Sequence, residues 1–130
     1  MKRYSDEQIR KTLLKYDTEE ICVELSVAES RPARILGTED AYALLDRLIE
    51  QERSQPLRRP RFPYWAEIWP ASLGLSRYFI DNETPEPRHI VKELGCGLGL
   101  VGIALAQLGR RVEATDFVED ALVFASHNAI

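Results

Sequence analysis

The sequence predicts an α/β protein in which a parallel sheet follows a small α+β N-terminal element. Two short runs, HIVKEL at 89–94 and RVEATD at 111–116, have the length and composition of strands. Helical patterns follow them at 102–108 and 120–128, and a cluster of glycines joins the first run to its helix. This alternation of strand and helix is typical of a βαβ unit with parallel strands and a right-handed crossover.

The N-terminal element, residues 1–55, is expected to begin with a helix. Ser5 precedes Gln8 by three residues, which is the spacing of a capping box. Ile9, Leu13 and Leu14 then fall on one helical face. We therefore expect a short amphipathic helix that packs by this face.

A strand is expected next, because side-chain character alternates along ICVELSV at 21–27. One face carries Ile21, Val23, Leu25 and Val27, and the other carries Cys22, Glu24 and Ser26. This period of two indicates a strand with one buried face. The segment ARIL at 33–36 is predicted to pair with it as a hairpin.

A second helix is predicted with Thr38 as its N-cap and with Glu39 and Asp40 in its first turn. Its apolar stripe consists of Ala41, Leu44, Leu45, Leu48 and Ile49. The stretch SQPLRRPRFP at 54–63 then brings three prolines, which remove backbone donors and disfavour helix before them. We predict a linker at 56–63 between the N-terminal element and a main domain at 64–130.

The main domain is expected to begin with YWAEIWP at 64–70. Pro70 suits the first turn of a helix that continues through residues 71–80. The strand HIVKEL is predicted to be buried, and Gly109 is predicted to end the helix at 102–108. A last helix is expected from Asp120 to Asn128.

Composition argues against several classes of protein. A net charge of −4 and a pI near 5.3 disfavour binding to nucleic acid. No apolar run approaches the ~20 residues that span a bilayer, and the N-terminus lacks the apolar region of a secretory signal. Cys22 and Cys96 are the two cysteines, and they form no metal-ligand pattern. We therefore expect a cytoplasmic protein with reduced thiols, no metal, no nucleic-acid partner and no membrane association.

The glycine-rich segment KELGCGLGLVG at 92–102 lies where parallel α/β sheets bind ligands, at the carboxyl end of a strand. The following helix directs free N–H groups toward such a ligand. Asp116 ends the next strand, where a carboxylate can accept hydrogen bonds from a ribose. Two ligands fit. Gly97, Gly99 and Gly102 spell the G-x-G-x-x-G of dinucleotide sites, and S-adenosylmethionine shares the adenosine but carries no phosphate.

Glu93 favours the second ligand. It lies two residues before Gly95, at the carboxyl end of the strand. A carboxylate would repel a pyrophosphate but would attract an ammonium and a sulfonium. Gly95 also shifts the motif toward E-x-G-x-G-x-G.

At this point the chain resembles a known family. VKELGCGLGLVGIALAQLG, followed by VEATD, is similar to the first motif and second-strand acid of the class I, seven-β-strand methyltransferases. The upstream PYWAEIWPASLGLSRYF resembles the protein-lysine methyltransferase group of that class, including relatives that methylate the β subunit of electron-transfer flavoprotein. The resemblance, over roughly residues 62–128, implies a Rossmann-like doubly wound parallel sheet, S-adenosylmethionine as cofactor and a protein side chain such as lysine as acceptor.

The resemblance also implies the role of single residues. A tryptophan at the place of Trp69 lies against the cofactor in that group, and Asp116 matches the acid that binds ribose. The predicted cofactor-binding residues are Trp69, Glu93, Gly95, Cys96, Gly97, Gly99, Asp116 and Phe117.

The chain departs from the family in its extent. Only two strands of the sheet are predicted here, so the sheet is expected to be incomplete, and the catalytic residues, which are unknown, are expected beyond Ile130. We therefore expect the N-terminal part of a longer enzyme. An unpaired strand edge also predicts self-association.

Other interpretations remain open. The alternatives are a small-molecule methyltransferase, a dinucleotide-binding oxidoreductase and a non-catalytic nucleotide-binding module, since fold does not fix function. A separate alternative is that Gly95, Gly97 and Gly99 form only a tight turn from strand to helix and bind no ligand. Trp65 is expected to be a packing residue, and Asn128 is expected to have a role at the end of its helix.

Overall fold

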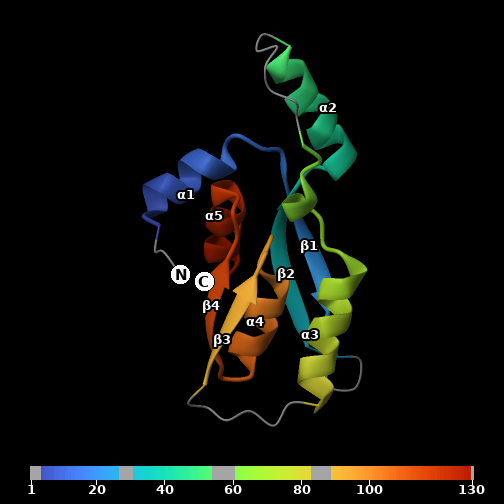
Figure 1. Cartoon of the computed structure of the whole chain (residues 1–130), viewed down its shortest axis with the longest axis vertical. Helices are drawn as coiled ribbons and strands as arrows, with labels where there is room; N and C mark the ends of the chain where they lie inside the picture. Colours follow the sequence, from blue (N-terminus) through green and yellow to red (C-terminus); the bar gives the residue numbers. More distant parts are fainter. Residues whose placement is uncertain (1–3, 27–30, 54–60, 83–88, 130) are drawn as a thin grey trace.

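The computed structural model describes residues 4–26, 31–53, 61–82 and 89–129 (Figure 1). Its elements in chain order are α1 (Asp6–Leu13), β1 (Thr18–Glu24), β2 (Pro32–Thr38), α2 (Ala41–Glu52), the 3-10 helix η1 (Tyr64–Ala66), α3 (Pro70–Asn82), β3 (Ile90–Leu94), α4 (Leu100–Gln107), β4 (Arg111–Thr115) and α5 (Glu119–Asn128). No helix within these ranges is long and apolar enough to cross a bilayer.

The predicted βαβ unit is confirmed. Strands β3 and β4 run parallel, with Ile90 beside Arg111 and Leu94 beside Thr115. Helix α4 connects them, and Gly109 follows its end with a φ of 80°, as expected for a helix stop. The carboxyl ends of both strands therefore lie at the same edge, next to the glycine loop.

The expectation that β3 is buried is wrong. Burial alternates along this strand, and the side chains of Ile90 and Leu94 are 45% and 82% exposed. The physical reason is that β3 pairs only with β4 among the described strands, while its apolar residues suit a strand with neighbours on more sides.

The predicted hairpin is confirmed and shares a hydrophobic core with the second half of the chain. Strands β1 and β2 pair antiparallel, with Ile21 beside Ile35. Leu25 and Ile35 are fully buried and pack in one cluster with Leu98 and Phe124. Strand β2 contacts both α4 and α5, so the hairpin packs against the second half of the chain through these two helices (Figure 1).

Helix α1 begins as predicted. The Gln8 N–H donates to Ser5 Oγ at 3.3 Å, and Gln8 Oε1 accepts from the Ser5 N–H at 2.8 Å. Ile9 is buried against Val123 of α5. The prediction for Leu14 is wrong: it is 74% exposed, because the helix ends at Leu13 and residue 14 leaves the packed face.

The predicted cap of α2 is also wrong. Thr38 ends β2, and its hydroxyl donates to the carbonyl of Glu39 instead. Asp40 is the N-cap, since its carboxylate accepts from the Tyr42 N–H at 2.8 Å. The acids expected in the first turn therefore stand before the helix, because pairing with β1 keeps Thr38 extended. Residues 56–60 of the predicted linker, and Val27, lie outside the described residues.

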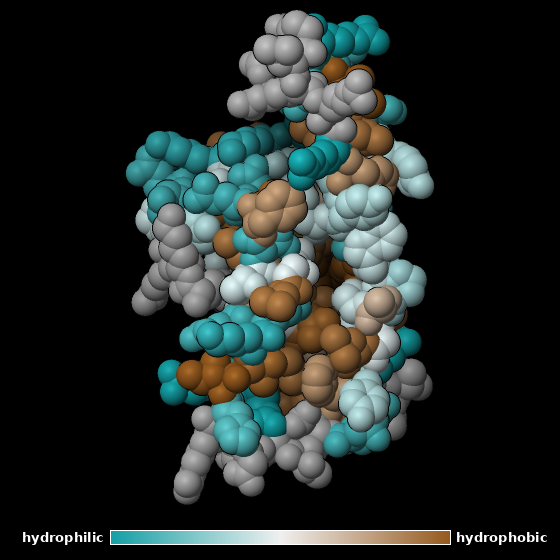
Figure 2. Space-filling view, viewed as in Figure 1, coloured by the Kyte–Doolittle hydropathy of each residue, from teal (hydrophilic) through white to brown (hydrophobic). Residues whose placement is uncertain are grey.

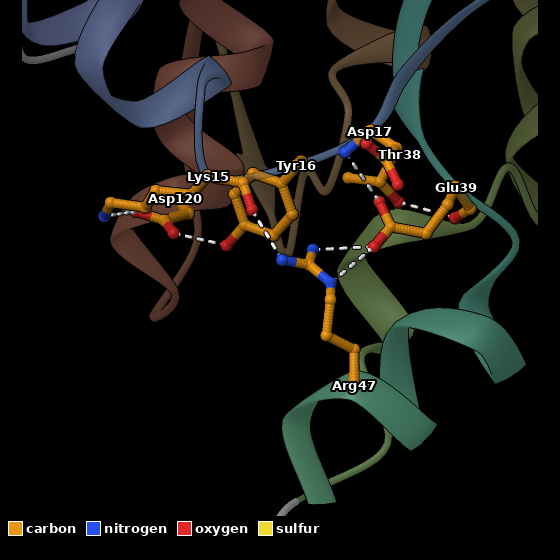
Figure 3. A network of polar contacts seen from close by, with 7 residues as sticks. All are labelled: Lys15, Tyr16, Asp17, Thr38, Glu39, Arg47 and Asp120. Atoms are coloured by element: carbon orange, nitrogen blue, oxygen red, sulfur yellow. Dashed lines mark hydrogen bonds and ion pairs between the residues drawn. The ribbon is translucent and has the colours of Figure 1, made fainter. Parts of the chain in front are cut away.

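A polar network joins α2 and α5 to the segment between α1 and β1 (Figure 3). The Tyr16 hydroxyl donates to Asp120, which also pairs with Lys15 at 3.4 Å. The Arg47 guanidinium donates to Glu39 at 2.9 Å and to the Lys15 carbonyl at 2.7 Å. Burial raises the pKa of Tyr16, so its phenol remains a proton donor. These bonds fix the N-terminal element against α5.

Candidate functional site

A cavity of about 1520 Å³ opens at the carboxyl ends of β3 and β4. Helix α3, the η1 segment, β3 and the glycine loop contribute to its wall, and apolar side chains gather around the hollow (Figure 2). Seven predicted cofactor-binding residues line it: Trp69, Glu93, Gly95, Cys96, Gly97, Asp116 and Phe117. This volume exceeds the roughly 300–1,000 Å³ of usual ligand pockets, so the cavity has room for a ligand the size of a nucleoside.

The glycine loop is shaped by close contacts at two positions. Gly97 has a φ of 52°, and a Cβ there would lie 3.1 Å from the Trp65 carbonyl oxygen. Gly99 has a φ of 90°, and its Cβ would lie 3.0 Å from that of Ala125 in α5. Gly99 is not part of the cavity wall, so its position is explained by the packing of α4 against α5. Gly95, by contrast, borders open space.

Asp116 holds the loop to the end of β4. Its carboxylate accepts from the Gly97 N–H and from the Val118 N–H, both at 3.0 Å. The Cys96 N–H adds a bond to the Thr115 carbonyl at 2.9 Å. A carboxylate has about four acceptor positions, so Asp116 keeps capacity for hydroxyl donors in the cavity.

Glu93 is the carboxyl of the site whose pKa is shifted. The pKa of its carboxyl is raised to about 7. Burial is the main cause and the negative charge of Asp116 adds to it, while the Gly102 backbone amide offsets part of the increase. No hydrogen bond of ordinary geometry reaches Glu93 Oε2, although this atom is buried. A cation bound in the cavity beside Glu93 would favour the ionised form of this carboxyl.

Gly102 explains how this carboxylate fits against α4. A Cβ at Gly102 would lie 2.7 Å from Glu93 Oε2. The sequence interpretation assigned Gly102 only to a dinucleotide motif, whereas the structure shows that it leaves space for an acid. The available signal was a glycine inside a helix, which costs stability and so indicates a close approach.

Cys96 is a buried, free thiol in the cavity wall. Burial, together with the charges of Glu93 and Asp116, raises the pKa of this thiol to about 12. It is therefore neutral near pH 7 and a poor nucleophile.

The aromatic residues of the wall divide into two kinds. Trp65 packs edge-on against Tyr16 and in a tilted contact with Phe124, each at 5.5 Å, which confirms its expected packing role. Trp69 is 41% exposed, and its Nε1 donates to the Tyr64 carbonyl at 2.8 Å. Phe117 is 86% exposed. Trp69 and Phe117 thus offer apolar faces to a ligand. Within the described ranges, no His, Cys, Asp or Glu side chains gather in a group that could hold a metal ion.

Comparison with known proteins agrees with this site. The profile of a family described as "Lysine methyltransferase" matches residues 65–129, which is half of the chain. The electron transfer flavoprotein beta subunit lysine methyltransferase of Homo sapiens is 42% identical over 55 residues, which are 42% of this chain and 21% of the relative. Its homolog in Caenorhabditis elegans is 33% identical over 67 residues, 51% of this chain and 28% of the relative.

A third relative is the protein-lysine methyltransferase METTL21E of Mus musculus, 41% identical over 59 residues, 43% of this chain and 24% of the relative. The chain therefore matches between about a fifth and just over a quarter of the length of these relatives. The profile match begins at Trp65 and contains the glycine loop, Glu93 and Asp116. On this match, the chain belongs to the lysine methyltransferase family.

Proposed function

We propose that this chain carries the cofactor-binding part of an S-adenosylmethionine-dependent methyltransferase whose acceptor is a lysine side chain of a protein. The observation that carries the proposal is Glu93, a half-buried carboxyl that lines the cavity and has one buried oxygen without a hydrogen bond of ordinary geometry. Such a group suits a cationic ligand and opposes a pyrophosphate. The relatives named for the electron transfer flavoprotein beta subunit make that protein the first acceptor to test.

The residues of the wall fit the cofactor in three places. Glu93 would bind the ammonium of the methionine end, and Gly95 leaves open space beside it. Asp116 would accept from the ribose hydroxyls with the acceptor positions that the loop does not use. Trp69 and Phe117 would cover apolar parts of the ligand. A Rossmann-like, doubly wound sheet around β3 and β4 forms part of the same proposal.

The residues of the chain would act mainly by binding and orienting. When bound, S-adenosylmethionine supplies a methyl group that its sulfonium already activates. The protein therefore needs to hold the acceptor in line and keep it unprotonated. The apolar part of the wall, with Leu75, Phe79 and Val101, would exclude water from an incoming amine and so lower its pKa.

Calorimetric titration of the protein with S-adenosylhomocysteine and with NAD tests the ligand. We expect binding of the first alone, and we expect Glu93→Gln to weaken it at least tenfold. Glu113→Gln is the matched control, because Glu113 lies on β4 and does not line the cavity, although its ion-pair partner Lys92, at 3.6 Å, does. Binding of NAD and not of S-adenosylhomocysteine would support the dinucleotide interpretation and overturn the proposal.

The acceptor is tested separately with methyl-tritiated cofactor and purified electron transfer flavoprotein. Label in its beta subunit, lost when lysines are blocked by acetylation, would support a protein-lysine acceptor. Label that appears only in small molecules of a lysate would support the small-molecule alternative.

A further inference from the structure

The side-chain amide of Asn128, at the end of α5, joins two distant parts of the fold. Its Oδ1 accepts from the Leu36 N–H at 2.8 Å, and its Nδ2 donates to the carbonyls of Leu36 and Leu98, both at 3.0 Å. Leu36 lies in β2, and Leu98 lies in the glycine loop. The amide thus pairs with Leu36 as a neighbouring strand would, and it ties the loop to the same point.

These bonds hold one peptide of the loop at both ends. The carbonyl of Leu98 accepts from Asn128, and the N–H of the next residue, Gly99, donates to the Cys96 carbonyl at 2.9 Å. Gly99 has a φ of 90°, but glycine takes negative values as readily. Gly99 therefore permits the positive φ of this turn but does not by itself favour it over a negative φ. The bond from Asn128 to the Leu98 carbonyl favours the observed turn.

The same loop carries the cavity wall. Gly95, Cys96 and Gly97 precede the clamped peptide and line the cavity, whereas Asn128 does not. The direct link from Asn128 to this wall is its bond to the Leu98 carbonyl, beside the contact of Ala125 in the same helix with Gly99. If the loop populates other turns, the apparent affinity falls by the fraction of molecules that keep the competent one.

We propose that Asn128 is a positioning residue that selects the ligand-binding conformation of the glycine loop and couples this loop to the N-terminal hairpin. The inference rests on the proposed function for the identity of the ligand. The clamp, by which we mean the hydrogen bonds of Asn128 to Leu36 and Leu98, can be measured without ligand. It assigns the hairpin a part in cofactor binding, although neither of its strands lines the cavity.

The test compares Asn128→Ala with Tyr16→Phe. The second variant loses the hydroxyl bond to Asp120, which also fastens α5 to the N-terminal element but does not touch the loop. Both variants should unfold at a lower temperature than the wild type. At a temperature where all three are folded, we expect the dissociation constant of S-adenosylhomocysteine to rise about tenfold in Asn128→Ala and to stay unchanged in Tyr16→Phe. Equal affinities in the two variants would overturn the proposal.

Asn128→Asp provides a second measurement that does not depend on the alanine variant. A carboxylate keeps the acceptor for Leu36 but loses both donors, and it places a negative charge beside two carbonyl oxygens. The two carbonyl oxygens disfavour the ionised form and so raise the pKa of this carboxyl above the ordinary value of about 3.9. Protonation restores one donor, so the affinity deficit relative to wild type at the same pH should shrink between pH 8 and pH 5. A deficit that is the same at both pH values would contradict the clamp.

Hydrogen exchange of the Gly99 amide separates this inference from the proposed function. We expect faster exchange in Asn128→Ala than in Tyr16→Phe, with no ligand present. If the wild type fails to bind S-adenosylhomocysteine but this difference is found, the proposed function fails and the clamp stands. If exchange at Gly99 is equal in both variants, the clamp fails whatever the ligand is.

Discussion

Replacing Glu93 by glutamine should make the protein more stable at high pH. The pKa of this carboxyl is about 7 in the folded chain, against an ordinary value of 4.5. A raised pKa means that folding favours the protonated form. The stabilising contribution of the proton is complete below pH 4.5, and it is lost as the pH rises through 7.

The size of the effect follows from the shift. Each pKa unit corresponds to about 1.4 kcal/mol, and the window between pH 5 and pH 8 contains most of the shift. Allowing for partial solvent screening, the ionised Glu93 should lower the free energy of unfolding by about 2 kcal/mol across this window. Glutamine fills nearly the same space and has no proton to lose, so the variant should lack this share of the pH dependence.

Urea unfolding at pH 5, 6, 7 and 8 measures the effect in wild type, Glu93→Gln and Glu113→Gln. The stability of Glu93→Gln relative to wild type should rise by about 2 kcal/mol from pH 5 to pH 8. Glu113→Gln should follow the wild type within a few tenths of a kcal/mol, since an exposed ion pair contributes little. If the free energies of unfolding of wild type and Glu93→Gln change in parallel with pH, the pKa of Glu93 is not raised by folding and this reasoning is refuted.

Three further predictions concern the same loop. Gly102→Ala should raise the free energy of unfolding by about 0.5–1 kcal/mol through helix propensity, yet weaken S-adenosylhomocysteine binding in calorimetry, because the new methyl displaces the Glu93 carboxylate. Asp116→Ala should weaken the same binding by roughly 1–3 kcal/mol, and unchanged affinity would remove Asp116 from the site. Gly99→Ala should destabilise the chain by about 1–3 kcal/mol in urea unfolding, through its positive φ and its contact with Ala125, and a neutral result would contradict the packing role.

Local patterns predicted much of this structure. The capping box at Ser5, the alternation in the hairpin and the strand–helix–strand order all depend on residues close in sequence, and each was confirmed. The predicted cap of α2 was wrong because Thr38 and Asp40 are both good caps. The choice between them depends on where β2 stops pairing with β1, and spacing alone does not show this.

The sequence also predicted that Glu93 and Asp116 lie at one site, since the strand ends of a parallel pair meet at one edge, and both residues line the cavity. It did not separate the roles of the glycines. That Gly99 meets Ala125 and that Gly102 makes room for Glu93 are contacts between elements, visible only once the helices are placed.

The chain has two tryptophans, Trp65 and Trp69, and both belong to the wall of the cavity. All of its intrinsic indole emission therefore originates beside the glycine loop, with one ring packed and the other partly in solvent. A ligand that enters the cavity should change the wavelength and the intensity of this emission without any added dye. The intrinsic tryptophan fluorescence of the protein should therefore report ligand binding directly, which suits rapid-mixing experiments and the screening of candidate ligands.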